Sequence, residues 1–248
     1  MTEALFLADL NHPQVGGEFT LGGDEGRHAA AVRRVRPGET IVVADGAGTA
    51  IKGEVTASDK TSVTLRIDEV LQAERPPVRY VAAQALAKGD RAELAVEMLT
   101  ELGVDRIIPW QASRSVVRWT PDREERQLGR WRSTAREATK QSRRLRVPIV
   151  AAPVSTRELA LLARDVACTL ILHEGAADPI SHLDLPTEGD VLLVIGPEGG
   201  LTGEEIAALE EAGGRQVLVS DAVLRTSTAG VVALAQLQAL QRRVSKAK

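Results

Sequence analysis

The pattern of apolar and polar residues changes near residue 75. Before that point it is typical of short strands, predicted over residues 39–44, 53–55 and 62–70, the last of which alternates apolar and polar positions. Residues 45–48 (DGAG) lie between two such runs and predict a hairpin turn. Residues 26–35 predict a short helix with a basic face. The first 75 residues are therefore interpreted as a small β domain.

From residue 78 onward, predicted strands alternate with predicted helices. Strands are expected over residues 78–86, 104–110, 167–173, 191–195 and 216–220. Helices are expected from residue 90 to 102, from 121 to about 144, over 156–165, from 202 to 213 and over 226–243. Such alternation favours an α/β fold, a mostly parallel sheet covered by helices. Pro76 and Pro77 mark the linker, so we predict domains at 1–75 and 76–248.

Helix ends carry their own signals. Ser155 with Glu158, and Thr202 with Glu205, have the spacing of capping boxes, and Asp90 with Glu93 resembles one. Gly103 is expected to end the helix that precedes it in a left-handed conformation.

Composition narrows the class of protein. Hydrophobic residues make up 44% and charged residues 26% of the 248, as in ordinary globular proteins, and no apolar run approaches the roughly 20 residues of a membrane span. The N-terminus lacks a basic leader and Cys168 is the one cysteine, so we expect a cytoplasmic protein. The four histidines lack the spacing of metal ligands, and no metal is expected.

Charge is distributed unevenly along the chain. The net charge of −3 argues against indiscriminate coating of nucleic acid, yet residues 114–146 contain eleven basic and four acidic residues. A second basic group consists of Arg27, Arg33, Arg34 and Arg36. These residues are either a solvated face with ordinary ion pairs or a phosphate-binding surface. Arginine predominates and is suited to bidentate phosphate contacts, which favours RNA.

Residues 196–200 (GPEGG) form the strongest candidate site. They follow a predicted buried strand and precede a capped helix, so free backbone N–H groups are expected at the carboxyl edge of the sheet, where α/β proteins bind ligands. A carboxylate at Glu198 would repel a phosphate but tolerate a cationic sulfonium ligand. The alternative is an ordinary turn.

Arg225 lies at the start of the last predicted helix, where the helix dipole disfavours a cation. An arginine in that position either pairs with Glu198 or Glu204 or neutralises a substrate that loses a proton.

Taken together, these motifs resemble the RsmE family of SPOUT (trefoil-knot) methyltransferases, which methylate ring nitrogen 3 of a uridine in 16S ribosomal RNA. The resemblance covers nearly the whole chain. It is carried by IGPEGGL at 195–201 with LRT at 224–226, by TELGV at 100–104 and by Lys88-Gly89-Asp90. Ser227 and the pair Val219-Ser220 depart from the usual pattern, which puts the backbone of the third cofactor loop in question.

The resemblance implies a PUA-like β-barrel that helps to hold RNA, a knotted α/β domain and a homodimer. It also implies an S-adenosylmethionine site in three loops, made up of Leu172, His173, Glu174, Ile195, Gly196, Pro197, Glu198, Gly199, Gly200, Leu218, Val219, Ser220, Val223, Leu224 and Thr226.

The reaction requires groups that act on the base and groups that hold the RNA. Arg225 is the candidate for stabilising negative charge on the uracil oxygens, and Glu198 is the weaker candidate for the proton acceptor. The candidate contacts to 16S rRNA in the small ribosomal subunit are Arg33, Arg34, Lys88, Arg91, Arg114, Gln141 and Arg144.

Two rival functions remain open at this point. One is a related knotted methyltransferase that acts on a different RNA position. The other is a non-catalytic RNA-binding or ribosome-assembly factor, which intact GPEGG and LRT motifs argue against.

Charge reversal at Arg33 and Arg34 should weaken RNA binding and flatten its dependence on salt, because fewer counterions would be released. Filter-binding or fluorescence titrations across a salt series measure this slope. An unchanged slope would assign both arginines to a solvated face.

Overall fold

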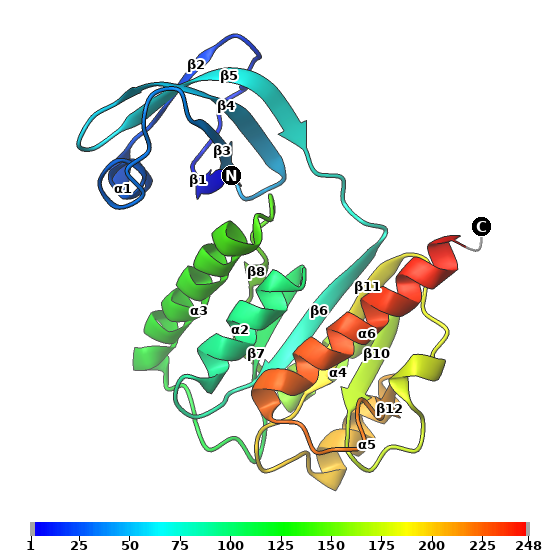
Figure 1. Ribbon diagram of the computed structural model, residues 1–248. Helices are drawn as coiled ribbons and strands as arrows, with labels where there is room; N and C mark the ends of the chain where they lie inside the picture. Colours follow the sequence, from blue (N-terminus) through cyan, green and yellow to red (C-terminus); the bar gives the residue numbers. More distant parts are fainter. Residues whose placement is uncertain (1–2, 247–248) are drawn as a thin grey trace. The chain divides into compact units, whose positions relative to one another are not determined.

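The computed structural model describes residues 3–246, which form two compact units (Figure 1). One unit extends to Arg75 and includes Thr139–Val147, and the other comprises Pro76–Ala138 and the chain from Pro148. The predicted boundary leaves residues 139–147 in the second domain instead. They belong to the first because the Arg146 guanidinium donates to the carbonyls of Ala47 and Ala73.

The first unit is built on a five-stranded sheet of order β1-β3-β4-β5-β2. Its strands are β1 (Ala4–Leu7), β2 (Glu18–Leu21), β3 (Thr40–Ala44), β4 (Thr49–Ser58) and β5 (Val63–Gln72). β1 pairs with β3 in parallel, and the other pairings are antiparallel. The predicted strands at 39–44 and 62–70 are confirmed, the one at 53–55 is part of a longer strand, and β1 and β2 are additional.

The predicted hairpin turn at residues 45–48 is confirmed. The Asp45 carboxylate accepts hydrogen bonds from the backbone N–H groups of Ala47, Gly48 and Thr49 at 2.7–2.9 Å. The predicted helix at 26–35 lies further toward the N-terminus, because α1 (Gly23–Arg27) continues into a π-helical turn (His28–Val32). Arg34 then adopts a φ of 55°, which ends the turn and leaves Arg33 and Arg34 exposed.

The second unit is a parallel sheet of order β12-β10-β11-β6-β7-β8, with β9 paired to β7. The strands are β6 (Val78–Ala85), β7 (Arg106–Gln111), β8 (Ile149–Val150), β9 (Val154–Ser155), β10 (Cys168–Leu172), β11 (Gly189–Ile195) and β12 (Gly214–Val217). The helices are α2 (Arg91–Glu101), α3 (Pro121–Ser142), α4 (Thr156–Arg164), α5 (Gly203–Glu211) and α6 (Thr226–Lys246), and the end of α3 from Thr139 onward belongs to the first unit. This is the α/β alternation that the sequence predicts.

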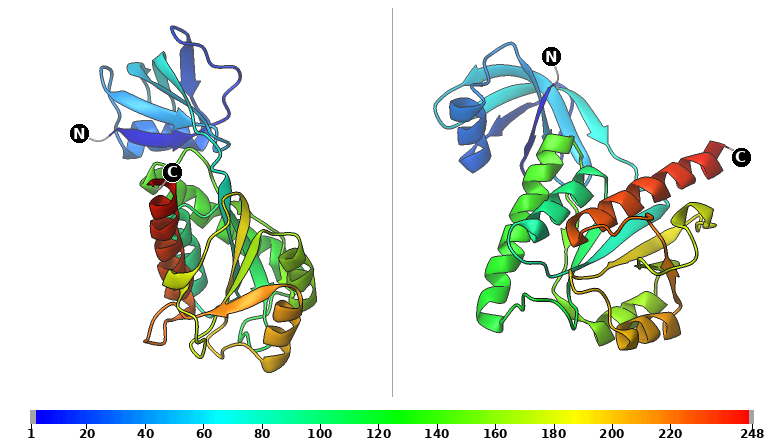
Figure 2. Two further views of the ribbon diagram at one scale, coloured as in Figure 1. Left: turned by 90° about the vertical axis from the view of Figure 1, so that its right-hand side faces the viewer. Right: turned by 60° about the horizontal axis from the view of Figure 1, so that its bottom comes forward.

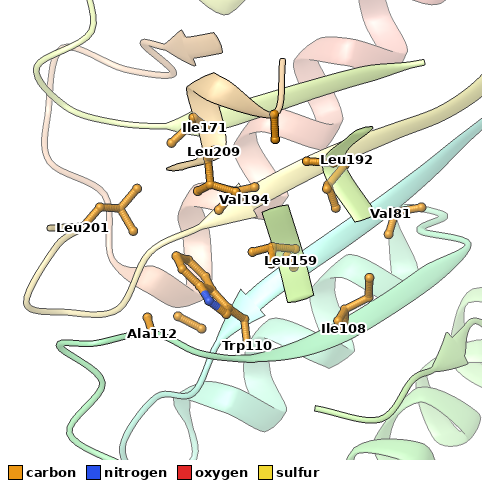
Figure 3. Close-up of a cluster of buried hydrophobic side chains, with 14 residues drawn as sticks. Val81, Ile108, Trp110, Ala112, Leu159, Ile171, Leu192, Val194, Leu201 and Leu209 are labelled. Carbon is orange, nitrogen blue, oxygen red and sulfur yellow. The ribbon is translucent and has the colours of Figure 1, made fainter. Parts of the chain in front are cut away.

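Helices cover both faces of this sheet. α2 packs against α6 on one face, and α4 packs against α5 on the other (Figure 2). On the second face, Leu159 of α4 and Leu209 of α5 meet Val81, Ile108 and Val194 of the central strands (Figure 3). Burying such side chains contributes roughly 1.5–3 kcal/mol each, so the packing fixes the strand ends on which the loops stand.

Two of the three predicted capping boxes are present in the structure. Both capping boxes, Ser155 with Glu158 and Thr202 with Glu205, are confirmed, and Gly103 has a φ of 93°. The Asp90 side chain makes no capping hydrogen bond, so the third prediction is wrong. The predicted strand at 216–220 begins at Gly214 and ends at Val217, because Leu218 pairs with the segment around Pro179 and no longer with β10.

Within residues 3–246, no helix is long and apolar enough to cross a membrane. The same residues contain no cluster of histidine, cysteine and acidic side chains that could hold a metal ion.

Lys140 and Glu25 form an ion pair of 2.8 Å inside the first unit, with side chains only 9% and 16% exposed. Lys140→Met should lower the free energy of unfolding by about 3 kcal/mol, because it leaves the Glu25 carboxylate buried without its cation. Adding Glu25→Gln should recover most of the loss, as measured by guanidinium unfolding. Equal losses in the single and double variants would show that the pair has no such effect.

Candidate functional site

Three loops at the carboxyl ends of β10, β11 and β12 enclose a cavity of about 300 Å³. The lining contains every residue predicted to bind the cofactor except Gly199, and it also contains Arg225. Gly199 lies beside Arg114 instead. Sequence reasoning missed Leu201, Ala222 and Ala229, which have no distinctive side-chain chemistry, and it assigned Arg91 to RNA rather than to the lining.

The loop after β11 keeps its shape through its glycines and its proline. A Cβ atom on Gly196 would lie 3.0 Å from the Leu201 side chain, so a larger residue would displace that wall of the cavity. The Gly200 N–H donates to the Pro197 carbonyl at 2.9 Å, and Gly200 adopts a φ of 71° that favours glycine. The loop is therefore an ordered, hydrogen-bonded turn.

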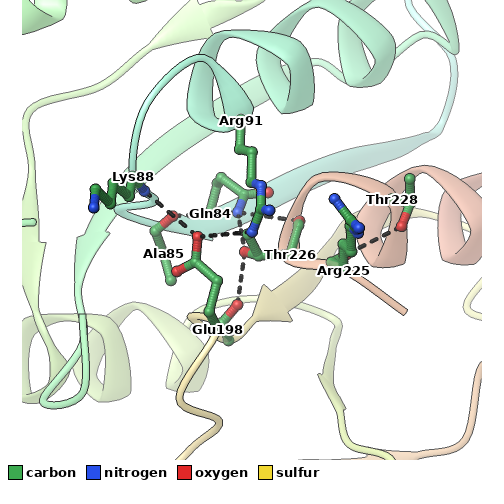
Figure 4. A network of polar contacts seen from close by, with 9 residues as sticks. Gln84, Ala85, Lys88, Arg91, Glu198, Arg225, Thr226 and Thr228 are labelled. Atoms are coloured by element: carbon green, nitrogen blue, oxygen red, sulfur yellow. Dashed lines mark hydrogen bonds and ion pairs between the residues drawn. The ribbon is translucent and has the colours of Figure 1, made fainter. Parts of the chain in front are cut away.

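A buried hydroxyl joins this loop to the centre of the sheet. The Thr226 Oγ1 accepts a hydrogen bond from Gln84 Nε2 at 2.9 Å and donates one to the Gly196 carbonyl at 2.8 Å (Figure 4). Gln84 is fully buried on β6, in register with Ile195 of β11. The hydroxyl thus links β6, the loop after β11 and the start of α6.

The third loop, after β12, is held by one hydrogen bond from α6 and one within the loop. Gln236 of α6 donates to the Val219 carbonyl at 2.9 Å, and the Ser220 hydroxyl accepts a hydrogen bond from the Ala222 N–H at 3.1 Å. The Ser220 side chain thus closes a small turn within the loop.

Charged side chains of both signs line the cavity. The Glu198 side chain is 26% exposed, with its Oε1 atom 3.8 Å from Arg91 Nη1 and 3.4 Å from the Lys88 N–H (Figure 4). Arg225 is exposed at the start of α6, and within the described part of the chain it forms no ion pair with Glu198 or Glu204. The alternative that Arg225 forms a salt bridge with Glu198 or Glu204 is therefore wrong.

Comparison with known proteins connects this geometry to a family. Residues 74–238 match the RNA methyltransferase domain, and residues 21–68 match the RNA methyltransferase PUA domain. Ribosomal RNA small subunit methyltransferase E of Mycobacterium bovis is 41% identical, over 98% of this chain and 94% of the relative. The chain belongs to the ribosomal RNA small subunit methyltransferase E family.

Other members of the family extend the comparison. The Bacillus subtilis member is 32% identical over 88% of this chain and 89% of its own length. A crystal structure of the Neisseria gonorrhoeae member bound to S-adenosyl methionine superposes with a TM-score of 0.85, at 29% identity, over 96% of this chain and 98% of that one. The fold is thus shared along nearly the whole chain.

The residues predicted to contact RNA lie in several places. Arg33, Arg34 and Gln141 are exposed on the first unit, and Arg144 is half-buried there. In the second unit, Lys88 is exposed and Arg91 lines the cavity. Arg114 Nη1 donates to the carbonyls of Gly199 at 3.1 Å and Leu201 at 3.4 Å, so this guanidinium already has a role in the protein. Their contacts with RNA stay a prediction.

Glu205 connects the loop after β11 to neighbouring segments of the chain. The residue is 3% exposed, and its carboxylate accepts hydrogen bonds from the N–H groups of Thr202 and Ser113 and from the Thr156 hydroxyl. Burial by itself raises the pKa of Glu205, but these hydrogen bonds outweigh burial and hold the pKa below its ordinary value.

Glu205→Gln should lower the free energy of unfolding by about 2 kcal/mol at pH 7. Because the folded-state pKa is depressed, the carboxylate's stabilisation is present above the unfolded pKa of about 4.3 and is lost as pH falls through the folded value. Denaturant unfolding at a series of pH values should therefore show the gap between variant and wild type narrowing in acid. A gap independent of pH would contradict this assignment.

Proposed function

We propose that this chain transfers the methyl group of S-adenosylmethionine to ring nitrogen 3 of a uridine in 16S rRNA of the small ribosomal subunit. The observation that carries the proposal is the three-loop cavity, whose loop after β11 is held by the contacts of Thr226 with Gln84 and Gly196. The chain that forms this cavity belongs to the methyltransferase family named above.

The cavity suits this cofactor. Its volume, about 300 Å³, lies at the lower end of the range for ligand sites, roughly 300–1,000 Å³. Backbone groups of the three loops are available to the adenine, because Gly196 and Gly200 allow close approach. The Glu198 carboxylate is compatible with a cationic sulfur and would repel the phosphates of a nucleotide. When bound, the cofactor supplies an activated methyl group on its sulfonium sulfur.

The chain's own residues act on the uridine. Ring nitrogen 3 loses its proton and gains the methyl group, so negative charge develops on the neighbouring uracil oxygens. Arg225 has no ion pair to glutamate within the described residues and is the group that stabilises this charge. Glu198 is the candidate to accept the proton, although its place beside Arg91 also suits it to position the cofactor. Holding base and cofactor in line supplies much of the rate.

Four further features belong to the same proposal. The first unit, a PUA-like β domain, holds the RNA, whereas the second performs the methyl transfer. The second unit is a trefoil-knotted domain, the active form is a homodimer, and the protein works in the cytoplasm. The family membership supports each of these.

Nucleoside mass spectrometry of 16S rRNA from cells with and without this protein tests the function. We expect 3-methyluridine to be absent without the protein and restored by it. A different missing methylated nucleoside would favour a related methyltransferase with another target position. No change in any nucleoside would favour a non-catalytic assembly factor.

Arg225→Ala should lower the methylation rate by about 10²–10³-fold, while affinity for S-adenosylmethionine stays within about tenfold of wild type. Single-turnover kinetics and calorimetry measure the two effects. Arg215→Ala, which removes an exposed arginine paired with Asp178, is the matched control and should leave both unchanged. Parallel losses of rate and cofactor affinity in Arg225→Ala would instead assign the arginine to the cofactor.

A further inference from the structure

Arg91 has a place in the cavity that its expected contact with RNA does not explain. It is the first residue of α2, where the helix dipole disfavours a cation. Its side chain nevertheless reaches the lining of the cavity and points toward Glu198 of the loop after β11 (Figure 4). An arginine kept at that helix end against the dipole needs a compensating partner, and Glu198 is that partner.

The contact between the two side chains is loose. Arg91 Nη1 lies 3.8 Å from Glu198 Oε1, longer than a direct hydrogen bond, and the Lys88 N–H reaches the same oxygen at 3.4 Å. The Arg91 side chain is 44% exposed and that of Glu198 26%. A carboxylate held this loosely is able to take on a second cationic partner without losing a strong bond.

The charges of the lining are balanced before any ligand enters. Among the lining residues, Glu174 and Glu198 are acidic, and Arg91 and Arg225 are basic. A ligand that brings one extra positive charge therefore meets both an attraction to Glu198 and a repulsion from Arg91. In a medium of intermediate dielectric, one charge a few ångströms away changes affinity measurably.

We propose that Arg91 is a positioning residue whose charge competes with the cationic sulfur of the cofactor for the Glu198 carboxylate. The competition limits how strongly the pocket prefers the charged cofactor to its neutral thioether product. This inference rests on the proposed function. Its consequence is that the Glu198 carboxylate would lie closer to Arg91 with the neutral thioether bound than with the charged cofactor bound.

The neutral thioether product is S-adenosylhomocysteine. The ratio of the affinities for S-adenosylmethionine and S-adenosylhomocysteine therefore measures the effect of the Arg91 charge on the charged sulfur alone. The two molecules share the adenine, the ribose and the amino-acid end and differ by the methyl group and the charge at sulfur. A contact of Arg91 with the shared carboxylate changes both affinities alike and cancels in the ratio.

Calorimetric titration of both ligands into the full chain therefore tests the proposal. Arg91→Gln should raise the preference for S-adenosylmethionine by about fivefold, and Glu198→Gln should lower it by a similar factor. Arg91→Lys keeps the charge and should restore a ratio near that of wild type. Arg130→Gln is the matched control and should leave the ratio unchanged, because Arg130 of α3 pairs at 3.9 Å with Glu93 of α2, the helix of Arg91, outside the cavity.

Three results would overturn the inference. One is an equal change of both affinities in Arg91→Gln, and another is a fall in the preference. The third is a ratio that responds to Glu174→Gln and not to Glu198→Gln. Failure of wild type to bind either ligand would instead overturn the proposed function, so the two failures are distinguishable.

Discussion

The hydroxyl of Thr226 is the contact on which the candidate site depends. The hydroxyl accepts a hydrogen bond from Gln84 on the central strand and donates one to the Gly196 carbonyl; Gln84 is fully buried and Thr226 is only 5% exposed. Removing one partner of a buried hydrogen bond leaves the others unsatisfied at a cost of about 1–3 kcal/mol. The loop after β11, the start of α6 and the end of β6 are therefore held in one arrangement, and Arg225 is placed at the cavity because it precedes Thr226.

Two glutamates near the loop after β11, Glu205 and Glu198, have different roles because their surroundings differ. Glu205 is buried and satisfied by four donor groups, which depresses its pKa and ties the loop after β11 to the segment at Ser113 and the start of α4. Glu198 is partly exposed and has only long contacts, so it stays available to a ligand. The well-bonded carboxylate holds the loop in place, and the loosely bonded one supplies the charge that a cationic cofactor needs.

The sequence predicted those parts of the fold that local pattern determines. The βα alternation, the capping boxes at Ser155 and Thr202 and the loop after β11 follow from short-range periodicity and motif, whereas the other two loops of the cavity were expected from the family resemblance. β1 and β2 were missed because four residues are too few for a period to show. Local pattern also does not specify distant partners: that Arg146 bonds to Ala47, that Arg114 bonds to Gly199 and that Arg91 faces Glu198 are consequences of the tertiary fold.

Calorimetry of S-adenosylmethionine binding to Thr226→Val tests whether the Thr226 hydroxyl holds the cavity in its binding shape. Valine has nearly the same shape as threonine but lacks the hydroxyl that joins Gln84 to Gly196. The account predicts a loss of affinity of about tenfold or more with the fold retained by circular dichroism. Thr228→Val, which removes only a local hydrogen bond to the Arg225 carbonyl, should bind as wild type does. Equal affinity of Thr226→Val and wild type would contradict the account.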